Sequence, residues 1–260
     1  MVLGLIQGKT ILVTGAAGGI GSVLCRVLAS GNRLLALDVD AGGLEALVED
    51  LRGRGHDVRA LVADVRDREA LATAVGRCGP VDILVNNAGG SETPSFGTMT
   101  EARWQRDLDV NLTGAYHAFE AVRPGMEERR AGVVVNVGSA NALTAMGHPA
   151  YSAAKAGLIS LTQSLALEFG PKGIRANIVL PGTVATAAWE TRAARDPAIF
   201  ERLRALYPLR RIVGAEDVAH AVAFLASDYA SCITGAVLGV DCGLLAGSPM
   251  LAHELTQEDF

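Results

Sequence analysis

The stretch KTILVTGAAGGIGSVLCRVLA, from Lys9 to Ala29, contains the pattern that decides the fold of this chain. Lys9 to Thr14 is a short apolar run with β-branched residues, which is typical of a buried strand. A glycine cluster from Gly15 to Gly21 ends this run, and Ser22 to Ala29 then reads as a helix. A strand, a glycine-rich turn and a helix in direct succession predict the first unit of an α/β sheet.

The glycine cluster also indicates what the turn binds. Glycines let a backbone approach a pyrophosphate closely, and the positive end of the following helix favours its negative charge. A plain connection between a strand and a helix would also use glycine. The position directly after a strand and before a helix is the context that a dinucleotide-binding turn requires. Gly15, Gly19, Ile20 and Gly21 are therefore predicted to bind a cofactor.

Apolar strands and amphipathic helices continue to alternate along the chain. Further strands are expected at 33–37, 58–63, 81–85, 132–137, 174–180 and 236–240, and helices at 43–52, 68–77, 101–128, 151–169 and 215–226. This alternation implies a parallel sheet that is covered by helices on both faces. Right-handed crossovers bring the carboxyl ends of the strands to one edge, where ligands bind in open α/β sheets.

An acidic residue stands where the second strand meets that edge. Asp38 lies roughly twenty residues beyond the glycine turn, where a carboxylate accepts hydrogen bonds from both ribose hydroxyls of an adenine nucleotide. It would repel a 2′-phosphate, and Ala16, Ala17 and Val39 supply no compensating cation. The sequence therefore favours NAD over NADP, while a role for Asp38 as a cap or turn residue stays open.

Two more strands end in polar or small residues at the same edge. Asp64 and Val65 follow the third strand, and Asn86 to Gly89 follow the fourth. These residues are expected beside Gly15 and Asp38. For Asn86 and Asn87, direct contact with the cofactor and a structural role in tying the turn together are both open.

The segment Tyr151 to Lys155 (YSAAK) suits proton transfer. If Tyr151 opens a helix, its side chain and that of Lys155 leave the same face one turn apart. A tyrosine has an unperturbed pKa of about 10, and a neighbouring ammonium stabilises its phenolate and brings it closer to working pH. Ser139, which follows the predicted strand 132–137, would hydrogen-bond the reacting oxygen. The five residues alone are also compatible with a chance pairing on an amphipathic helix.

Composition narrows the class of protein. The chain has 260 residues, of which 50% are hydrophobic and 5% aromatic, and it carries a formal net charge of -5, which argues against nucleic acid as a partner. Its four cysteines form no CxxC pair and have no histidine at ligand spacing, so no metal site is expected. No apolar run is long enough to span a membrane, and the start lacks a charged n-region, so a soluble cytoplasmic protein is expected.

One domain over residues 1–260 accounts for the whole pattern, because no linker or repeat interrupts it. The irregular, charged segment at about 183–211 is expected to form a substrate loop or lid. For the tail 247–260, partial disorder and docking on a neighbour are both open.

Several motifs together resemble the short-chain dehydrogenase/reductase family along nearly the whole chain. They are TGAAGGIG at Thr14 to Gly21, NNAG at Asn86 to Gly89, Asn111, Ser139, YSAAK at Tyr151 to Lys155, and PGTVAT at Pro181 to Thr186. The resemblance implies a single-domain Rossmann fold with a doubly wound seven-stranded parallel sheet. It also implies nicotinamide-dependent alcohol/carbonyl interconversion, usually by a homotetramer.

The resemblance further assigns roles to individual residues. It implies that Tyr151 is the general acid/base, that Ser139 orients the substrate oxygen, and that Lys155 lowers the pKa of Tyr151 and holds the nicotinamide ribose. Asn111 would anchor a water that links Lys155 to solvent. The remaining cofactor contacts implied are Asp64, Val65, Asn87, Ala88, Gly89, Pro181, Gly182, Val184 and Thr186.

The first functional hypothesis is an NAD-dependent dehydrogenase acting on a secondary alcohol of a small polar metabolite, such as a sugar, polyol or hydroxy acid. The residues expected to line its substrate pocket are Glu92, Asn141, His148, Trp189 and Arg192, each of which could equally be a loop residue. The alternatives are a 3-oxoacyl-carrier-protein reductase, a cyclic alcohol or steroid dehydrogenase, and a nucleotide-binding regulator without catalysis.

Overall fold

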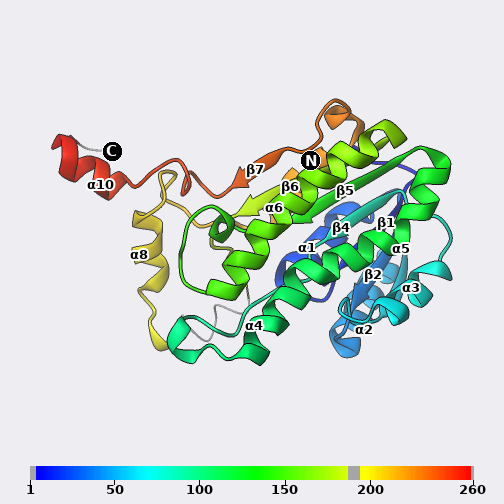
Figure 1. Ribbon diagram of the computed structural model, residues 1–260, viewed down its shortest axis with the longest axis horizontal. Coiled ribbons are helices and arrows are strands. Elements are labelled where there is room, and N and C mark those ends of the chain that lie inside the picture. Colours follow the sequence, from blue (N-terminus) through cyan, green and yellow to red (C-terminus); the bar gives the residue numbers. More distant parts are fainter. Residues whose placement is uncertain (1–3, 187–193, 259–260) are drawn as a thin grey trace.

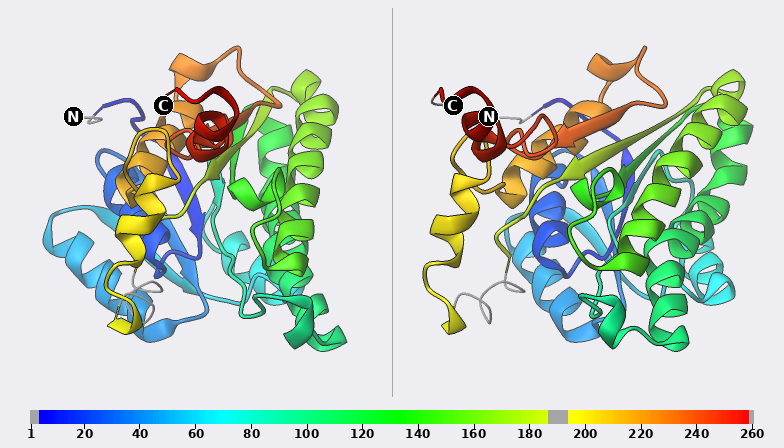
Figure 2. Two further views of the ribbon diagram at one scale, coloured as in Figure 1. Left: turned by 90° about the vertical axis from the view of Figure 1, so that its left-hand side faces the viewer. Right: turned by 60° about the vertical axis from the view of Figure 1, so that its left-hand side comes forward.

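A seven-stranded parallel sheet forms the centre of the molecule, with strand order β3-β2-β1-β4-β5-β6-β7 (Figures 1 and 2). The computed structural model describes residues 4–186 and 194–258. All neighbouring strands of the sheet pair in parallel. The predicted doubly wound Rossmann fold is therefore confirmed, with the two halves of the sheet diverging from β1 and β4.

The strands are β1 (Thr10–Thr14), β2 (Arg33–Asp38), β3 (Asp57–Val62), β4 (Ile83–Asn86), β5 (Gly132–Val137), β6 (Ile174–Pro181) and β7 (Val237–Val240). The helices used below are α1 (Gly19–Leu28), α2 (Ala41–Gly53), α3 (Arg68–Gly76), α4 (Glu101–Leu108), α5 (Gly114–Arg129), α6 (Pro149–Phe169), α8 (Ile199–Ala205), α9 (Ala215–Ala226) and α10 (Pro249–Thr256).

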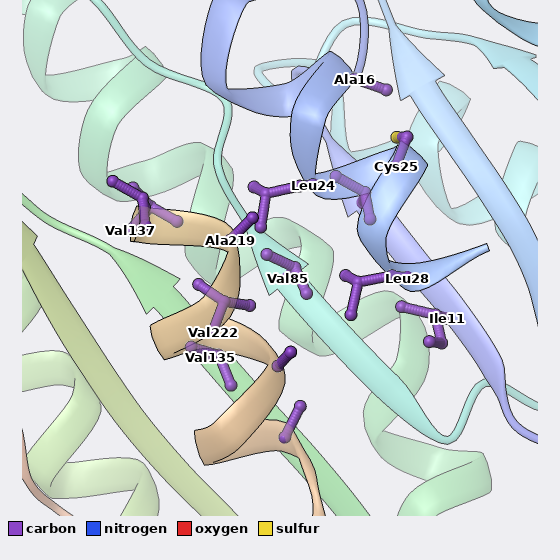
Figure 3. Close-up of a cluster of buried hydrophobic side chains, with 14 of the residues drawn as sticks. Ile11, Ala16, Leu24, Cys25, Leu28, Val85, Val135, Val137, Ala219 and Val222 are labelled. Atoms are coloured by element: carbon purple, nitrogen blue, oxygen red, sulfur yellow. The ribbon is translucent and has the colours of Figure 1, made fainter. Parts of the chain in front are cut away.

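Each face of the sheet is buried under its own layer of helices. On one face, Leu24 of α1 and Val222 of α9 pack over Val85 and Val135 of the central strands (Figure 3). On the other face, α3, α5 and α6 cover the sheet, with Phe119 and Phe169 in edge-to-face contact at a centroid distance of 5.0 Å. Because both faces are buried, the strands read as continuous apolar runs.

Two local departures from the sequence-based boundaries bear on the site. The first helix begins at Gly19, inside the glycine cluster. The first turn of this helix therefore forms part of the glycine-rich connection after β1. The helix expected over 101–128 is interrupted by a π-helical turn, Asp109–Thr113, between α4 and α5. Asn111 lies in this turn and is buried. Such single π turns occur frequently at functional sites.

The C-terminal third of the chain adds elements beyond the sheet edge. Figure 1 shows α8 and α10 at the same end of the molecule, away from the central strands. Leu251 and Leu255 of α10 are exposed. Val184 forms an isolated bridge with Val213, which joins the two ends of the segment expected to act as a lid.

Tyr207 anchors the start of that segment and provides a test of its packing. The Tyr207 side chain is fully buried, and its hydroxyl accepts a hydrogen bond of 2.9 Å from the backbone N–H of Thr183. Tyr207→Phe should lower the free energy of unfolding by about 1–2 kcal/mol, because this N–H loses its partner. Chemical denaturation of the variant checks this, with Tyr229→Phe as the exposed control; equal stability of both variants would contradict it.

Candidate active site

A cavity of about 560 Å³ opens at the carboxyl edge of the sheet, where the sequence predicts the site. Thirteen of the predicted residues line it: Gly15, Gly19, Ile20, Gly21, Asp38, Asp64, Val65, Asn87, Ala88, Gly89, Tyr151, Lys155 and Thr186. They come from β1, β2, β3, β4, α6 and the segment after β6, so the parallel topology brings them together. Tyr151 and Lys155 thus share one cavity with most of the predicted cofactor residues, whereas Asn111 and Ser139 are not among the residues that line it.

The glycine turn is a cradle with no space for side chains at two positions. Gly15 has a φ of +66°, and a Cβ there would lie 2.7 Å from the Cα of Ala88. A Cβ on Gly21 would overlap the carbonyl oxygen of Gly15. Because α1 begins at Gly19, between these two glycines, the N–H groups of its first turn belong to the cradle and have no partner within the helix. The cradle suits the pyrophosphate of a dinucleotide.

Asp38 ends β2 at the rim of this cradle. Its carboxylate accepts hydrogen bonds from the backbone N–H groups of Ala17, at 2.8 Å, and of Asp40, at 3.0 Å. Asp38 therefore does act as a turn residue, and these bonds also hold its carboxylate at the cavity. The two roles considered from the sequence are compatible.

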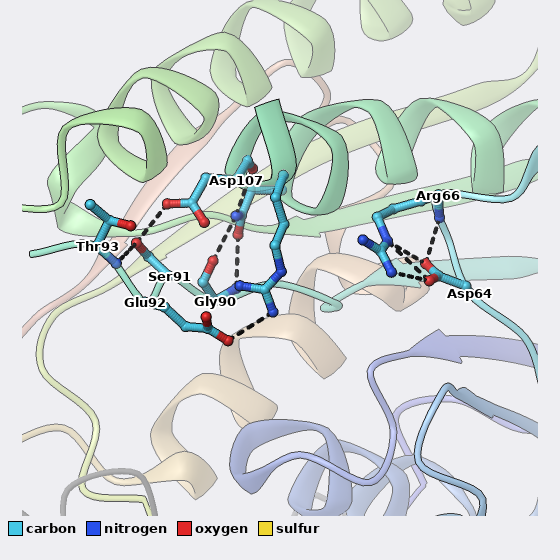
Figure 4. Close-up of polar contacts among 9 residues, drawn as sticks. Asp64, Arg66, Gly90, Ser91, Glu92, Thr93 and Asp107 are labelled. Carbon is cyan, nitrogen blue, oxygen red and sulfur yellow. Dashed lines mark hydrogen bonds and ion pairs between the residues drawn. The ribbon is translucent and has the colours of Figure 1, made fainter. Parts of the chain in front are cut away.

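A guanidinium that sequence reasoning did not anticipate lies at the next strand end. The side chain of Arg66 pairs with the carboxylate of Asp64 at 2.6 Å (Figure 4). This pairing lowers the pKa of the Asp64 carboxyl. The cation is thereby neutralised by Asp64 and lies on a different strand end from Asp38.

Asn87 ties the turn together, which is one of the two roles considered from the sequence. It also lines the cavity. Its amide group donates to the carbonyl oxygens of Thr14 and Gly15, at 3.1 and 2.9 Å. The Thr14 hydroxyl in turn accepts from the backbone N–H groups of Asn87 and Ala88. Asn86 points into the core, where its amide donates to Asn136 at 2.9 Å.

Tyr151 and Lys155 lie on the first turns of α6, which begins two residues before Tyr151, at Pro149. The Lys155 ammonium is buried, 5.6 Å from the centroid of the Tyr151 ring, and donates to the carbonyl oxygen of Val137 at 2.8 Å. Ser139 follows β5, and its hydroxyl accepts from the backbone N–H of Asn141 at 3.2 Å. Lys155 therefore lies beside the Tyr151 ring, and the Ser139 hydroxyl lies within hydrogen-bond reach of Tyr151.

The proton affinities differ from the sequence-based expectation. Burial raises the pKa of Tyr151; the Ser139 hydroxyl opposes this shift, and the negative charge of Asp107 adds to it. Burial also lowers the pKa of Lys155 to about 8. The sequence-based expectation was a lowered Tyr151 pKa, whereas desolvation of the phenolate is the largest effect here and raises it.

Asn111 is bound to the loop that follows the NNAG motif. Its side chain accepts from the N–H of Gly90 at 3.0 Å and donates to the carbonyl oxygens of Gly90 and Asp107, each at 2.8 Å. A Cβ on Gly89 would lie 2.6 Å from the Asn111 side-chain oxygen and 3.2 Å from the Lys155 ammonium. Asn111, Gly89 and Lys155 are thus in close contact.

Asn111→Leu should destabilise the protein by about 2–4 kcal/mol, because it leaves the buried carbonyl oxygen of Asp107 and the part-buried backbone groups of Gly90 without the side chain that pairs with them. The measurement is urea unfolding of the variant against the parent chain. The matched control is Asn141→Leu, since Asn141 bonds to half-buried or exposed groups. A loss for Asn111→Leu no larger than for the control would contradict this account.

The predicted substrate residues have different surroundings. The Asn141 amide donates to the Gly147 carbonyl oxygen and the Ser152 hydroxyl, each at 3.2 Å, so it ties its own loop. Glu92 is exposed and pairs with Arg106 at 2.9 Å (Figure 4). His148 lies edge-on to Tyr151 with ring centroids 6.5 Å apart. Trp189 and Arg192 lie outside the described residues.

Three predicted cofactor residues are not part of the cavity lining. Pro181 ends β6, Gly182 packs against Tyr207 and Asp241, and Val184 is buried at its bridge with Val213. Thr186 does reach the cavity, because its side chain occupies the space where a Cβ of Gly19 would be.

The lining also includes residues that sequence reasoning missed, among them Arg66, Gly90, Arg106, Val110 and Gly138. Arg66, Gly90 and Gly138 adjoin the predicted residues Val65, Gly89 and Ser139 directly, so extending each motif by one residue finds them. Val110 likewise adjoins the predicted Asn111, whereas Arg106, in α4, carries no such signal.

Within residues 4–186 and 194–258, no group of three or more histidine, cysteine, aspartate or glutamate residues is arranged to hold a metal ion. In the same part of the chain, none of the helices combines the length and the apolar character needed to cross a membrane.

Comparison with known proteins decides the family. Residues 15–245 match the family described as enoyl-(acyl carrier protein) reductase. An oxidoreductase of the short-chain dehydrogenase/reductase family from Burkholderia thailandensis has a crystal structure that superposes with a TM-score of 0.93, at 51% identity over 98% of this chain and all of that one. The chain belongs to the short-chain dehydrogenase/reductase family. It is an oxidoreductase of that family.

Other members of the short-chain dehydrogenase/reductase family resemble the chain over nearly its full length. An uncharacterised oxidoreductase of Schizosaccharomyces pombe is 40% identical over 98% of this chain and 97% of its own. A 3-oxoacyl-[acyl-carrier protein] reductase of Brucella melitensis with bound NAD is 31% identical, covers 92% of this chain and 91% of its own, and has a TM-score of 0.85. A Beutenbergia cavernae protein with bound NADP is 32% identical, covers 93% and 98%, and has a TM-score of 0.87. Both nicotinamide cofactors thus occur among similar structures.

Proposed function

We propose that the protein is an NAD-dependent oxidoreductase that interconverts a secondary alcohol and a ketone of a small polar metabolite. The observation that carries this proposal is the shared cavity, which is lined by Tyr151 and Lys155 and also by the glycine cradle and Asp38. A proton donor and a dinucleotide cradle in one cavity match the needs of hydride transfer.

The residues present fit a nicotinamide dinucleotide. The cradle of Gly15 and Gly21, which a Cβ would fill, would hold the pyrophosphate, Asp38 the adenosine ribose, and Lys155 the nicotinamide ribose. When bound, the nicotinamide supplies or accepts the hydride. The carboxylate of Asp38 supports NAD rather than NADP, and Arg66, which lines the same cavity, is engaged by Asp64.

Side chains of the protein transfer the proton. Tyr151, kept neutral by burial, donates its hydroxyl proton to the oxygen of a ketone, and takes it back when an alcohol is oxidised. Ser139 hydrogen-bonds the same oxygen and so stabilises the charge that develops on it. Lys155 lies beside the Tyr151 ring, where its charge stabilises a phenolate, and Asn111 packs against the backbone next to Lys155.

A second enzymatic function is supported by one observation. The Brucella melitensis reductase, which binds NAD, acts by its name on 3-oxoacyl-carrier protein. The formal charge of -5 counts against an acidic carrier protein as the substrate of this chain. A regulator without catalysis would have no need of Ser139, Tyr151, Lys155 and Asn111 together.

We infer the following organisation for the whole protein. Residues 1–260 form one catalytic domain, with residues 183–211 as its substrate loop and 247–260 as a tail. The protein is cytoplasmic and assembles as a homotetramer. The exposed side chains of Leu251 and Leu255 on α10 support a role of the tail in a contact between subunits.

The experiment that tests the function is absorbance at 340 nm with NAD and NADP in parallel, over sugars, polyols, hydroxy acids, cyclic alcohols and a steroid. Turnover with NAD that vanishes in Tyr151→Phe supports the proposal. Turnover that survives the substitution contradicts the mechanism. Tight NADH binding without turnover of any substrate favours the regulator.

Asp38→Ala should weaken the affinity for NAD about tenfold and reduce the preference over NADP, because a charged hydrogen-bond acceptor is lost and its repulsion of a 2′-phosphate disappears. Fluorescence titration with NADH and NADPH measures both effects. Asp40→Ala is the control, since Asp40 caps α2 through Gly43 on the same loop. An unchanged preference in Asp38→Ala would contradict the assigned ribose contact.

A further inference from the structure

A histidine outside the cofactor cavity holds one of the residues that line it. Nδ1 of His117, in α5, lies 3.0 Å from the backbone carbonyl oxygen of Val65. Val65 is buried and lines the cavity shortly after the end of β3. His117 is half-buried and is not among the lining residues. The contact therefore reaches the cavity wall from outside, between residues 52 positions apart in the chain.

The direction of this hydrogen bond follows from the chemistry of its two groups. A carbonyl oxygen only accepts, so Nδ1 of His117 carries a proton and donates it. This is true of the neutral ring with its proton on Nδ1 and of the charged ring, in which both nitrogens are donors. His117 is thus a donor to Val65 in either form of the ring.

The same face of α5 also contacts the side chain of Val65. Gly114 precedes His117 by three positions, so the two residues lie on one side of the helix. A Cβ on Gly114 would lie 2.6 Å from Cγ2 of Val65. The absence of a side chain at Gly114 lets the helix come close enough for the His117 ring to meet the backbone of Val65.

The two peptide units that meet at Val65 have four polar groups, and the protein holds three of them. His117 donates to the Val65 carbonyl oxygen, and the N–H of Arg66 donates to the Asp64 carboxylate at 2.9 Å (Figure 4). The carbonyl oxygen of Asp64 accepts from the N–H of Asp67 at 3.0 Å. The fourth group is the Val65 N–H, which has no hydrogen-bond partner within residues 4–186 and 194–258. Because buried donors rarely lack a partner, this N–H is available to a ligand in the cavity.

The sheet order indicates which part of a dinucleotide this wall would meet. β1, β2 and β3 are neighbours in that order, and the residues at their ends that line the cavity include the glycine cradle, Asp38 and Val65 in turn. With the pyrophosphate on the cradle and the adenosine ribose on Asp38, as proposed above, the group that continues toward β3 is the adenine base. Its ring nitrogens are hydrogen-bond acceptors, which suit the free N–H of Val65.

We propose that His117 is a positioning residue for the adenine end of the cofactor. By holding the Val65 carbonyl oxygen, it fixes the backbone whose free N–H faces the base, so that less ordering is needed when the cofactor binds. This inference rests on the proposed function, because it requires a dinucleotide in the cavity. It gives His117 no part in the transfer of the proton or the hydride.

His117→Leu tests the role, because leucine fills similar space without a donor. Its affinity for NADH should fall about five- to tenfold, the effect expected of one lost hydrogen bond, while kcat at saturating NADH stays within about twofold of the parent value. His117→Asn should restore most of the affinity, because the asparagine amide nitrogen stands as far along the side chain as Nδ1 and also donates. Isothermal titration measures the affinities.

ADP-ribose locates the loss, since it carries the adenine, its ribose and the pyrophosphate but no nicotinamide. Its affinity should fall in His117→Leu by the same factor as that of NADH. His220→Leu is the matched control, because it removes an exposed histidine from α9 and should change neither affinity. A loss for NADH without a loss for ADP-ribose would place the effect at the nicotinamide end and overturn the proposal.

The outcomes separate this inference from the proposed function. If the parent chain binds neither NADH nor ADP-ribose, the dinucleotide site fails and the inference with it. If it binds both but oxidises no alcohol of the panel, the proposed reaction fails, while the affinities still decide the role of His117. Equal affinities of His117→Leu and the parent overturn the inference, as does a loss that His117→Asn leaves unrestored. Should circular dichroism show that the leucine variant is unfolded, His117→Ala takes its place.

Discussion

Tyr151→Phe is expected to lower kcat/KM by about 10²–10⁴-fold, the range that general acid–base catalysis contributes, while the fold and cofactor affinity are retained. The substitution removes one oxygen atom and leaves the ring that packs beside Lys155 and His148. Because burial keeps the Tyr151 hydroxyl protonated, the phenylalanine variant has no proton to give to a ketone oxygen at this position. Steady-state kinetics in the direction of ketone reduction measures the loss most directly.

The control for this prediction is Tyr229→Phe, which changes an exposed tyrosine in the short 3₁₀ turn after α9. It should keep the activity of the parent chain. NADH affinity, followed by fluorescence, should be equal in both variants. A Tyr151→Phe variant that keeps a tenth or more of the activity would show that another group transfers the proton.

Lys155→Met is expected to abolish turnover and yet to stabilise the fold. Lys155 is 3% exposed, and burial lowers its pKa from the ordinary value of 10.5 to about 8. A difference of this size means that burying the charged form costs about 3 kcal/mol at pH 7. Methionine has a similar shape and no charge, but it gives up the hydrogen bond to Val137. The net gain in the free energy of unfolding should be about 1–2 kcal/mol, or about 2–8 °C in Tm.

The pH dependence of this gain has a defined sign. Below pH 8 the lysine is charged in both the folded and the unfolded chain, so the full burial penalty is present. Between pH 8 and 10.5 the unfolded chain binds more protons at this residue than the folded chain, so the stability of the parent rises with pH. The advantage of Lys155→Met should therefore shrink as the pH rises through this window.

Unfolding curves of the parent and the variant at pH 7 and pH 9.5 check this directly. Lys9→Met provides the control, because Lys9 is exposed and should change the free energy of unfolding by less than about 0.5 kcal/mol at either pH. A Lys155→Met variant that is less stable than the parent at pH 7 would contradict the penalty derived from burial.

The architecture could be predicted because its signals are local and repeated. Lys9 to Thr14 and Val133 to Val137 read as apolar strands, and both lie in the sheet close to the predicted bounds. The glycine turn was recognisable because a strand and a helix flank it, and the structure places it in the cavity with Asp38. Parallel topology then explains why Ser139, far away in sequence, reaches the same edge.

The details of the site depended on contacts that no local pattern encodes. The π turn around Asn111 forms while its side chain bonds to Gly90, twenty-one residues away, which a helical pattern cannot indicate. The pairing of Arg66 with Asp64 and the bond from Asn87 to Gly15 likewise depend on the folded edge. The pKa of Tyr151 is raised because the side chain is buried, and spacing along a helix does not reveal burial.

The order of strands and helices, the glycine cradle and the motif residues Ser139, Tyr151 and Lys155 could thus be identified from the chain alone. Each is encoded by a pattern of neighbouring residues. Only the tertiary structure decided that His117 donates to Val65, since the two residues lie 52 positions apart in the chain. It also decided the proton affinities of Tyr151 and Lys155. Burial and distance set these properties, and both exist only once the chain has folded.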